Sequence, residues 1–428
     1  MALAAPAAAT GHTTVGHDGN WPADLRWFVF ALFFIFGGIT SLNDILIPKL
    51  RGLFALTHTE SMLVQFAFFT AYFLVSLPAA LVVRKCGYMR SAAIGLLTMT
   101  AGCLLFIPAS TSGLFPGFLL ALFVLASGVV LVQVVSNPLI SMLGAPQSAH
   151  SRLTFAQAFN SLGTTVFPFF GARLILGSFE DVEPANLDAA AQAAFRSAQT
   201  QVIVHTYIGL AVALVIVAAV VWLRRNRLPH VAVAGGGMLD SFDLLKRPRF
   251  AFGTLGIFLY VGGEVAIGST LVSYLTQANV LGVDARAAGE LVALYWGGAM
   301  VGRFIGAWLL KRFPPALVLA GAALGACALL GLSGTSTGHV AGYALLAVGL
   351  MNSIMFPTIF SLACEGLGDR APDGSGLLCM AIVGGAVVPL LFGVVADMST
   401  LATALVVPAA CYLGIIMFAR YCRRHPIL

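Results

Sequence analysis

Charged residues are scarce in this sequence, and their scarcity excludes most soluble proteins. Asp, Glu, Lys and Arg make up 9% of the 428 residues, whereas ordinary globular domains carry roughly 25%. So few charges cannot cover a surface that faces water. Hydrophobic residues instead reach 59%, with a mean hydropathy of +0.94, and apolar windows of about 18 residues recur from end to end. We therefore expect the chain to lie in a lipid bilayer.

Nucleotide, thiol and metal sites are also missing. No G-x-x-x-x-G-K-[ST] pattern is present, so no phosphate-binding loop supplies energy from this chain. The seven cysteines form no C-x-x-C pair, and the eight histidines show no H-E-x-x-H or other paired spacing. We expect no metal and no cofactor. The net charge of +6 is typical of loops held on the cytoplasmic side of a membrane, and we expect no nucleic acid partner.

Apolar runs separated by charges, glycine or proline predict twelve helices, each long enough to span a bilayer. The first six are expected near residues 27–48, 61–83, 91–110, 114–141, 152–177 and 200–223. The second six are expected near residues 250–276, 287–310, 315–334, 339–363, 373–397 and 400–420. The predicted fold class is an all-α membrane protein with twelve transmembrane helices in two pseudo-symmetric six-helix bundles.

Basic residues predict the boundaries and the orientation of these bundles. A basic connection at 224–249 divides a bundle at 27–223 from a bundle at 250–422, with tails at 1–26 and 423–428. The first tail lacks the basic and apolar regions of a cleavable signal peptide. Lys and Arg gather in alternate loops, whereas the loop after the fifth helix is acidic. By the positive-inside rule, we expect a multi-pass protein of the bacterial inner membrane with both termini in the cytoplasm.

The two halves show a weak internal repeat. Arg84 at the end of the second helix matches Lys311 at the end of the eighth, and Gly163 matches Gly384, at spacings of 227 and 221 residues. Secondary transporters use two repeated halves to alternate access around a central site. The repeat therefore favours a transporter over an enzyme or a receptor.

Two acidic residues lie inside predicted helices, where an ionised carboxylate is costly unless it is hydrated or paired. Asp44 lies in the first helix, between Ser41 and Pro48, and we expect it to take up a coupling cation. Solvation at the outer end of the helix is the alternative. Glu264 lies in the seventh helix with no basic neighbour in the sequence. We expect it to hold a cation or bind a ligand hydroxyl, with a structural contact between helices as the alternative.

Neutral amides on the middle helices predict a substrate rich in hydroxyl groups. Each amide offers a donor and an acceptor and carries no charge that would demand an ionic substrate. The predicted substrate-binding residues are Gln133, Asn137, Gln157, Asn160, Tyr260, Glu264, Trp296 and Asn352. Isolated amides in membranes also hold helices together, and aromatic side chains also fill helix interfaces, so packing is the alternative for each.

Six segments resemble the fucose permease family of the major facilitator superfamily, and more closely its bacterial glucose/galactose permease branch. The resemblance spans nearly the whole chain. The segments that carry it are Leu42–Pro48, Gln133–Pro138, Ala156–Gly163, Tyr260–Gly268, Trp296–Arg303 and Phe356–Phe360.

The resemblance implies proton-linked sugar uptake, with Asp44 as the coupling residue and Asn160 near the sugar. Fucose permeases have a glutamate where this sequence has Gln133, and no acid where it has Glu264. This exchange is typical of the glucose/galactose branch and argues against carrying over fucose specificity or a two-acid proton relay. Some relatives couple to sodium, so a proton is favoured and sodium is the alternative. The superfamily's loop motif keeps its bases at 82–90 but lacks its aspartate.

We therefore predict a secondary active transporter, not an enzyme, that imports a neutral hexose with a cation and acts as a monomer. Glucose and galactose are the expected sugars. A symporter of N-acetylglucosamine or another amino sugar is the alternative within the class, because a pocket of amides also accepts an acetamide. A drug exporter and an intramembrane enzyme acting on lipid-linked sugars are the remaining alternatives.

Overall fold

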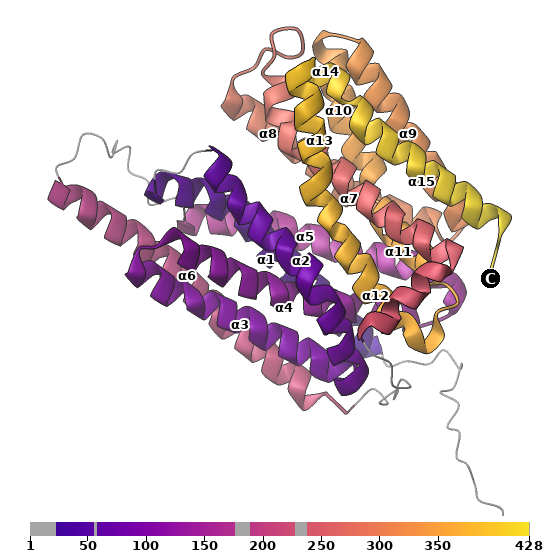
Figure 1. Cartoon of the computed structure of the whole chain (residues 1–428), viewed down its shortest axis with the longest axis horizontal. Coiled ribbons are helices and arrows are strands. Elements are labelled where there is room, and N and C mark those ends of the chain that lie inside the picture. Colours follow the sequence, from indigo (N-terminus) through magenta and orange to yellow (C-terminus); the bar gives the residue numbers. More distant parts are fainter. Residues whose placement is uncertain (1–22, 55–57, 176–188, 227–237, 428) are drawn as a thin grey trace, which may run out of the picture.

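The fold is built from helices arranged in two bundles (Figure 1). In the computed structural model, residues 23–54, 58–175, 189–226 and 238–427 are described, and every regular element in these ranges is helical. The first bundle contains α1 (Ala23–Phe54), α2 (His58–Cys86), α3 (Tyr88–Ser112), α4 (Phe115–Met142), η1 (Pro146–Ser148), α5 (Ala149–Ile175) and α6 (Ala189–Leu223).

The described part of the second half begins with a short 3-10 segment, and three of its membrane passes are interrupted helices. Its elements are η3 (Met238–Lys246), α7 (Pro248–Leu275), α8 (Ala285–Leu309), α9 (Pro315–Thr335), α10 (Gly338–Asn352), α11 (Met355–Cys364), η4 (Gly368–Arg370), α12 (Ala371–Met380), η5 (Ala381–Val383), α13 (Gly384–Met398), α14 (Leu401–Ala404) and α15 (Val406–Arg424). The pairs α10 with α11, α12 with α13, and α14 with α15 each form one pass, so the described residues contain six passes in each bundle. Among the described residues, nine helical segments are long and apolar enough to cross a membrane. The predicted fold class is confirmed.

The two bundles repeat the same pattern of helix contacts. In the first bundle α1 packs on α5, α3 packs on α4 and α6, and α2 packs on α4. In the second, α7 packs on α13, α9 packs on α10 and α15, and α8 packs on α10. Matched glycines allow two of these contacts, because a methyl group on Gly163 would overlap the Phe34 carbonyl of α1 and one on Gly384 would overlap the Phe258 carbonyl of α7. The weak sequence repeat therefore marks equivalent close packing.

Several predicted helices differ from the observed ones. Those expected near 373–397 and 400–420 are each interrupted, the first at η5 and the second at Leu405. The helix expected near 200–223 begins earlier, at Ala189, because an alanine-rich stretch with high helix propensity precedes the apolar run. The helix expected near 339–363 is interrupted between Asn352 and Met355. Pro357 explains the break, since it has no N–H to donate to the carbonyl four residues earlier.

The connection between the bundles lies partly outside the described residues, so its predicted boundaries stay a prediction. Its described part includes η3, in which Lys246 Nζ lies 2.6 Å from Asp243 Oδ1. The hydrogen bond from Lys246 lowers the pKa of the exposed Asp243 carboxyl. Lys246 begins a basic stretch that continues with Arg247 and with Arg249 of α7.

The bundles meet at one end of the molecule and diverge toward the other (Figure 1). At the meeting end α2 and α4 pack on α12, and α5 packs on α8 and α11. The Ser375 hydroxyl donates to the Val134 carbonyl at 2.9 Å, and the Ser151 hydroxyl donates to the Ala307 carbonyl at 2.7 Å. We call this region the closed end.

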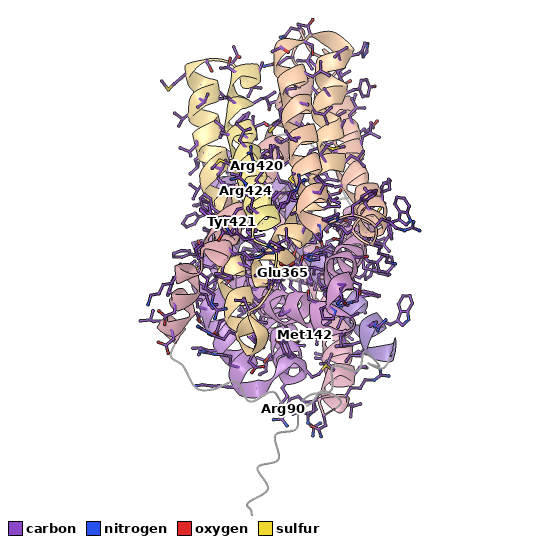
Figure 2. All side chains as sticks on the ribbon, turned by 90° about the vertical axis from the view of Figure 1, so that its right-hand side faces the viewer. Arg90, Met142, Glu365, Arg420, Tyr421 and Arg424 are labelled. Carbon is purple, nitrogen blue, oxygen red and sulfur yellow. The ribbon has the colours of Figure 1, made fainter. Side chains whose placement is uncertain are left out.

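An ion pair between the bundles also lies at the closed end. Arg84 at the end of α2 lies 3.2 Å from Asp373 of α12, which also pairs with Arg370. The segment at 82–90 has no aspartate of its own, and its Arg84 pairs instead with Asp373 of the other bundle. Figure 2 views this end and shows Arg90 on one bundle and Arg424 on the other.

Candidate functional site

A guanidinium group from α8 joins the two bundles above the closed end. Arg303 donates to the Gln157 carbonyl of α5 at 3.0 Å and to the Ser161 hydroxyl one turn farther along the same helix. It also donates to the Ser353 carbonyl at 3.3 Å within its own bundle. Arginine suits this position because its planar fork satisfies several acceptors at once. Arg303 therefore fixes the distance between α5 and α8.

The break between α10 and α11 supplies acceptors for this cluster. Pro357 leaves the Ser353 carbonyl without its helical donor, and Arg303 replaces that donor. The adjacent Asn352 carbonyl accepts a hydrogen bond from the Tyr260 hydroxyl of α7 at 3.2 Å. Unpaired carbonyls are costly in lipid, so both groups are satisfied by residues of the site.

Glu264 of α7 belongs to the same polar cluster. Its backbone carbonyl accepts from the Tyr295 hydroxyl at 3.5 Å. The Arg303 guanidinium of α8 acts on the Glu264 carboxyl group electrostatically, while its hydrogen bonds go to α5 and to the Ser353 carbonyl. The sequence gives Glu264 no basic neighbour, but the fold places the charge of Arg303 within electrostatic range.

Asn352 is fully buried and holds two tyrosines. Its amide donates to the Tyr295 hydroxyl at 2.8 Å and accepts from the Tyr412 hydroxyl at 2.7 Å. In this conformation both polar atoms of the amide are therefore engaged within the second bundle. A direct contact between Asn352 and a sugar stays a prediction, and what the structure shows is the positioning of the tyrosines around Glu264.

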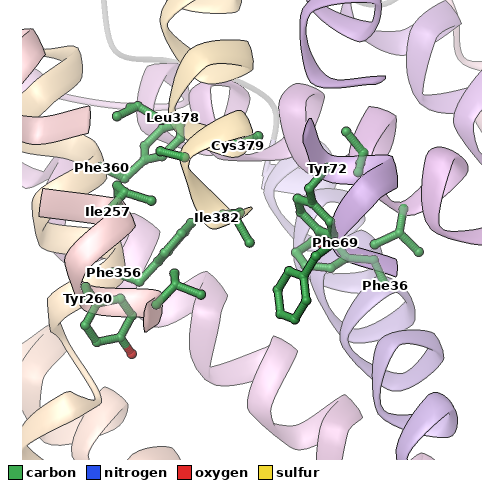
Figure 3. Close-up of a cluster of buried hydrophobic side chains, with 14 of the residues drawn as sticks. Phe36, Phe69, Tyr72, Ile257, Tyr260, Phe356, Phe360, Leu378, Cys379 and Ile382 are labelled. Atoms are coloured by element: carbon green, nitrogen blue, oxygen red, sulfur yellow. The ribbon is translucent and has the colours of Figure 1, made fainter. Parts of the chain in front are cut away.

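The first bundle contains an amide that a tyrosine of a neighbouring helix holds in place. Gln133 of α4 is buried, and its Oε1 accepts a hydrogen bond of 2.8 Å from the Tyr72 hydroxyl of α2. Because the oxygen is occupied, the NH₂ group is left to donate elsewhere. Figure 3 shows Tyr72 on one side and Tyr260 with Phe356 on the other, with Ile382 between them.

The three remaining predicted amides of the first bundle have different surroundings. Gln157 is buried on α5 next to the arginine contact, and Asn160 is half-buried and donates to the Phe33 carbonyl of α1 at 3.3 Å. Asn160 fits against α1 because Gly37 has no side chain there. Asn137 is fully buried on α4, and neither atom of its amide has a hydrogen-bond partner among the described residues.

The two other predicted residues are Trp296 and Asp44. Trp296 of α8 is 47% exposed, packs edge-on to Tyr295 with 5.0 Å between ring centroids, and lies against Gly268 of α7. Asp44 lies within α1, but its side chain is outside the described part of the structure.

Three residues of the site were not assigned a role from the sequence. Arg303 is a base inside an otherwise apolar helix, and the reasoning applied to Glu264 would have found it. Tyr72 and Tyr412 have no comparable signal, because a tyrosine in a membrane helix is usually a packing residue. Their roles depend on partners 61 and 60 residues away in the chain.

Comparison with known proteins identifies the family. The family model of the Major Facilitator Superfamily matches residues 28–389. A glucose/galactose transporter of Brucella abortus is 44% identical over 96% of this chain and 97% of its own length. The L-fucose-proton symporter of Escherichia coli is 35% identical over 91% of each chain. A crystal structure of the transporter FucP in the outward conformation superposes with a TM-score of 0.85, at 31% identity, over 93% of this chain and 98% of that one. This chain therefore belongs to the major facilitator superfamily.

Proposed function

We propose that this protein imports a neutral hexose, glucose or galactose, together with a cation by alternating access. The names of the relatives support a sugar, and 44% identity over 96% of the chain favours the glucose/galactose transporter of Brucella abortus over the fucose symporter at 35%. A second relative of Helicobacter pylori, also 44% identical, carries the name putative glucose/galactose transporter.

The observation that carries the proposal is the pair of polar faces on the two bundles. One face offers the Gln133 amide, whose orientation Tyr72 fixes, and the other offers Tyr260 and Glu264. Donors and acceptors on both sides, with an exposed indole at Trp296, match the hydroxyl groups and the apolar face of a pyranose. A substrate bound between them contacts both bundles, which is what alternating access requires.

The proposed coupling residues are Asp44 and Glu264. Asp44 takes up the cation from outside, with a proton favoured because two relatives are named L-fucose-proton symporters. Arg303 acts electrostatically on Glu264 and bonds both bundles, so a change of charge at Glu264 is proposed to alter the contact between the bundles. No ATP is consumed, and the ion gradient drives uptake.

The closed end is proposed to face the cytoplasm. Arg90 and Arg424 lie on this end (Figure 2), and basic residues are retained on the cytoplasmic side of membranes. The structure then corresponds to an outward-open state of a multi-pass inner-membrane protein that acts as a monomer, with both termini inside. The likeness to a transporter solved in its outward conformation supports this assignment.

Uptake of labelled glucose into proteoliposomes tests the proposal. An inward proton gradient, and separately an inward sodium gradient, is imposed, and unlabelled galactose, fucose and N-acetylglucosamine are added as competitors. Gradient-stimulated uptake with competition by galactose supports the proposal. Stronger competition by N-acetylglucosamine indicates an amino-sugar transporter, and no stimulated uptake of any hexose contradicts the proposal.

A further inference from the structure

A buried histidine joins the two bundles at the closed end. His150 at the start of α5 is 5% exposed, and both of its ring nitrogens contact the other bundle. Nδ1 lies 2.6 Å from the Ser361 hydroxyl of α11, and Nε2 lies 2.9 Å from Glu365 Oε1, directly after α11. The site described above does not use this residue.

His150 can keep both contacts with or without an added proton, but not with the same strength. Ser361 Oγ lies 2.8 Å from the Pro357 carbonyl and 2.6 Å from Nδ1, and its one hydrogen goes to one or the other. A neutral imidazole donates from Nε2 to Glu365 and accepts from Ser361 at Nδ1. An imidazolium carries one more proton, donates from both nitrogens and adds a positive charge to the contact with the carboxylate.

The charges around this cluster allow His150 to lose that proton without stranding a buried carboxylate. Glu365 is also paired with Arg249 of α7, which in turn donates to the Leu362 carbonyl at 2.7 Å. Among the described residues, the other titratable groups that interact with this cluster are Cys422 of α15, beside Arg249 and Glu365, and Cys364 of α11, beside Glu365. Cys379 of α12 and Tyr88 of α3 interact in turn with Cys364, and Arg152 on α5 itself interacts with Arg26 of α1.

These groups leave His150 as the switchable contact. Arg152 is held by the Ile140 and Ser141 carbonyls at the α4 end, away from the second bundle. Arg249 keeps its partners within the second bundle whichever state His150 adopts. Protonation of His150 therefore changes the strength of a contact between the bundles rather than the charge balance within either one.

We propose that His150 is a cytoplasmic proton latch, a second proton-binding group that closes the inner end when protonated. The imidazolium bonds Glu365 and Ser361 across the bundles, and opening toward the cytoplasm breaks both contacts. A neutral imidazole keeps both contacts but lacks the positive charge, so it holds the bundles more weakly. An acidic cytoplasm then favours the outward-open state and slows release, whereas an alkaline cytoplasm favours opening. The inference rests on the proposed function only for its assignment of the closed end to the cytoplasm.

A cysteine placed in the closed seam reports its opening. Thr154 lies one turn after His150, is fully buried and faces Gly306 of α8. A Thr154→Cys thiol reacts with N-ethylmaleimide when the seam opens, and mass spectrometry of its peptide separates it from the seven native cysteines. The rate is measured in inside-out vesicles without sugar, between about pH 5.5 and 8. The same rate is measured for Thr154→Cys combined with His150→Gln. The ratio of the two rates removes the pH dependence of the thiol's own reactivity.

The latch predicts a ratio of labelling rates that depends on pH. The His150→Gln protein is expected to react about tenfold faster than its parent near the acidic limit and at a similar rate near the alkaline limit, because a charged hydrogen bond exceeds a neutral one by about that factor. His339→Gln, an exposed histidine on α10 at the opposite end, is the matched control and should leave the rate unchanged.

Two results decide the inference. A ratio that stays constant with pH, or that rises toward alkaline pH, overturns it. If His150→Gln does not insert into the membrane, Ser361→Ala removes the Nδ1 acceptor and should give a smaller effect in the same direction, and a constant ratio there overturns the latch equally. Because no sugar is present, a failure to transport hexoses leaves this measurement valid.

Discussion

Replacing Arg303 with alanine is expected to release the closed end. The guanidinium makes two hydrogen bonds to the first bundle, at the Gln157 carbonyl and the Ser161 hydroxyl, and one within its own bundle, at the Ser353 carbonyl. Only the first two are broken when the bundles separate. The third lies within one bundle and is present in both conformations of the parent. Its loss therefore affects stability and not the ratio of the two conformations.

The size of the shift follows from these two bonds. A hydrogen bond to a charged group contributes about 1.5–3 kcal/mol. Water replaces part of the loss, and other contacts between the bundles remain, including Ser151 with Ala307. We therefore expect Arg303→Ala to weaken the closed end by about 3 kcal/mol, which is roughly a hundredfold change in the ratio of the two conformations.

Spin labels across the closed end measure this ratio. Arg90 and Arg424 are exposed on this face, one on each bundle (Figure 2), so labels at Arg90→Cys and Arg424→Cys do not disturb buried contacts. The labels are placed in a variant that lacks the seven native cysteines. Pulsed electron paramagnetic resonance should show one short distance in the parent and a longer population in Arg303→Ala.

Two further variants separate this effect from a general loss of charge. Arg303→Lys keeps the charge but not the fork, and should give an intermediate distribution. Arg312→Ala removes an exposed base just after α8, which lies over the Trp308 ring at 5.7 Å, and should give none of the longer population. If a folded Arg303→Ala protein has the distance distribution of its parent, the reasoning is wrong.

Three other substitutions test the packing and the site. Asn352→Ala should lower the free energy of unfolding by about 2–4 kcal/mol, because it leaves the buried Tyr412 hydroxyl without its acceptor and removes the hydrogen bond to Tyr295, and thermal unfolding in detergent measures this against Asn352→Asp, which keeps an acceptor for Tyr412. Tyr72→Phe should raise the KM for sugar by about three- to tenfold with little change in melting temperature, because it frees the Gln133 amide to turn. Gly384→Leu should prevent folding, since its side chain would overlap the Phe258 carbonyl, and expression of monodisperse protein measures this.

The helices could be predicted from the sequence because each carries its own apolar run. The correspondence between the two bundles could also be predicted, since Gly163 and Gly384 occupy equivalent positions and have the same packing role in the two halves. The break after Asn352 was harder to predict from the sequence. A proline inside an apolar run can bend or interrupt a helix, and the outcome here depends on Arg303 and Tyr260 satisfying the carbonyls that the break exposes.

The site could be predicted only in part, because sequence spacing shows which residues share a helix face and not which faces meet. Glu264 stood out as an acid inside a helix, but Arg303, the base that acts on it electrostatically, lies on α8. Asn352 was expected to face the substrate, and the amide is occupied by hydroxyls from α8 and α15 in this conformation. The substrate role of each predicted residue stays a prediction.

Coupling of cation and sugar is the central claim, and comparing accumulation with exchange tests it most directly. Labelled glucose is supplied to proteoliposomes of the parent and of Asp44→Asn, first with an inward proton or sodium gradient and then with internal unlabelled glucose and no gradient. The parent should accumulate glucose above equilibrium and also exchange it. Asp44→Asn should exchange but not accumulate, because the neutral amide cannot carry the cation. Accumulation that survives in Asp44→Asn, or a parent that does not accumulate under either gradient, would contradict the account.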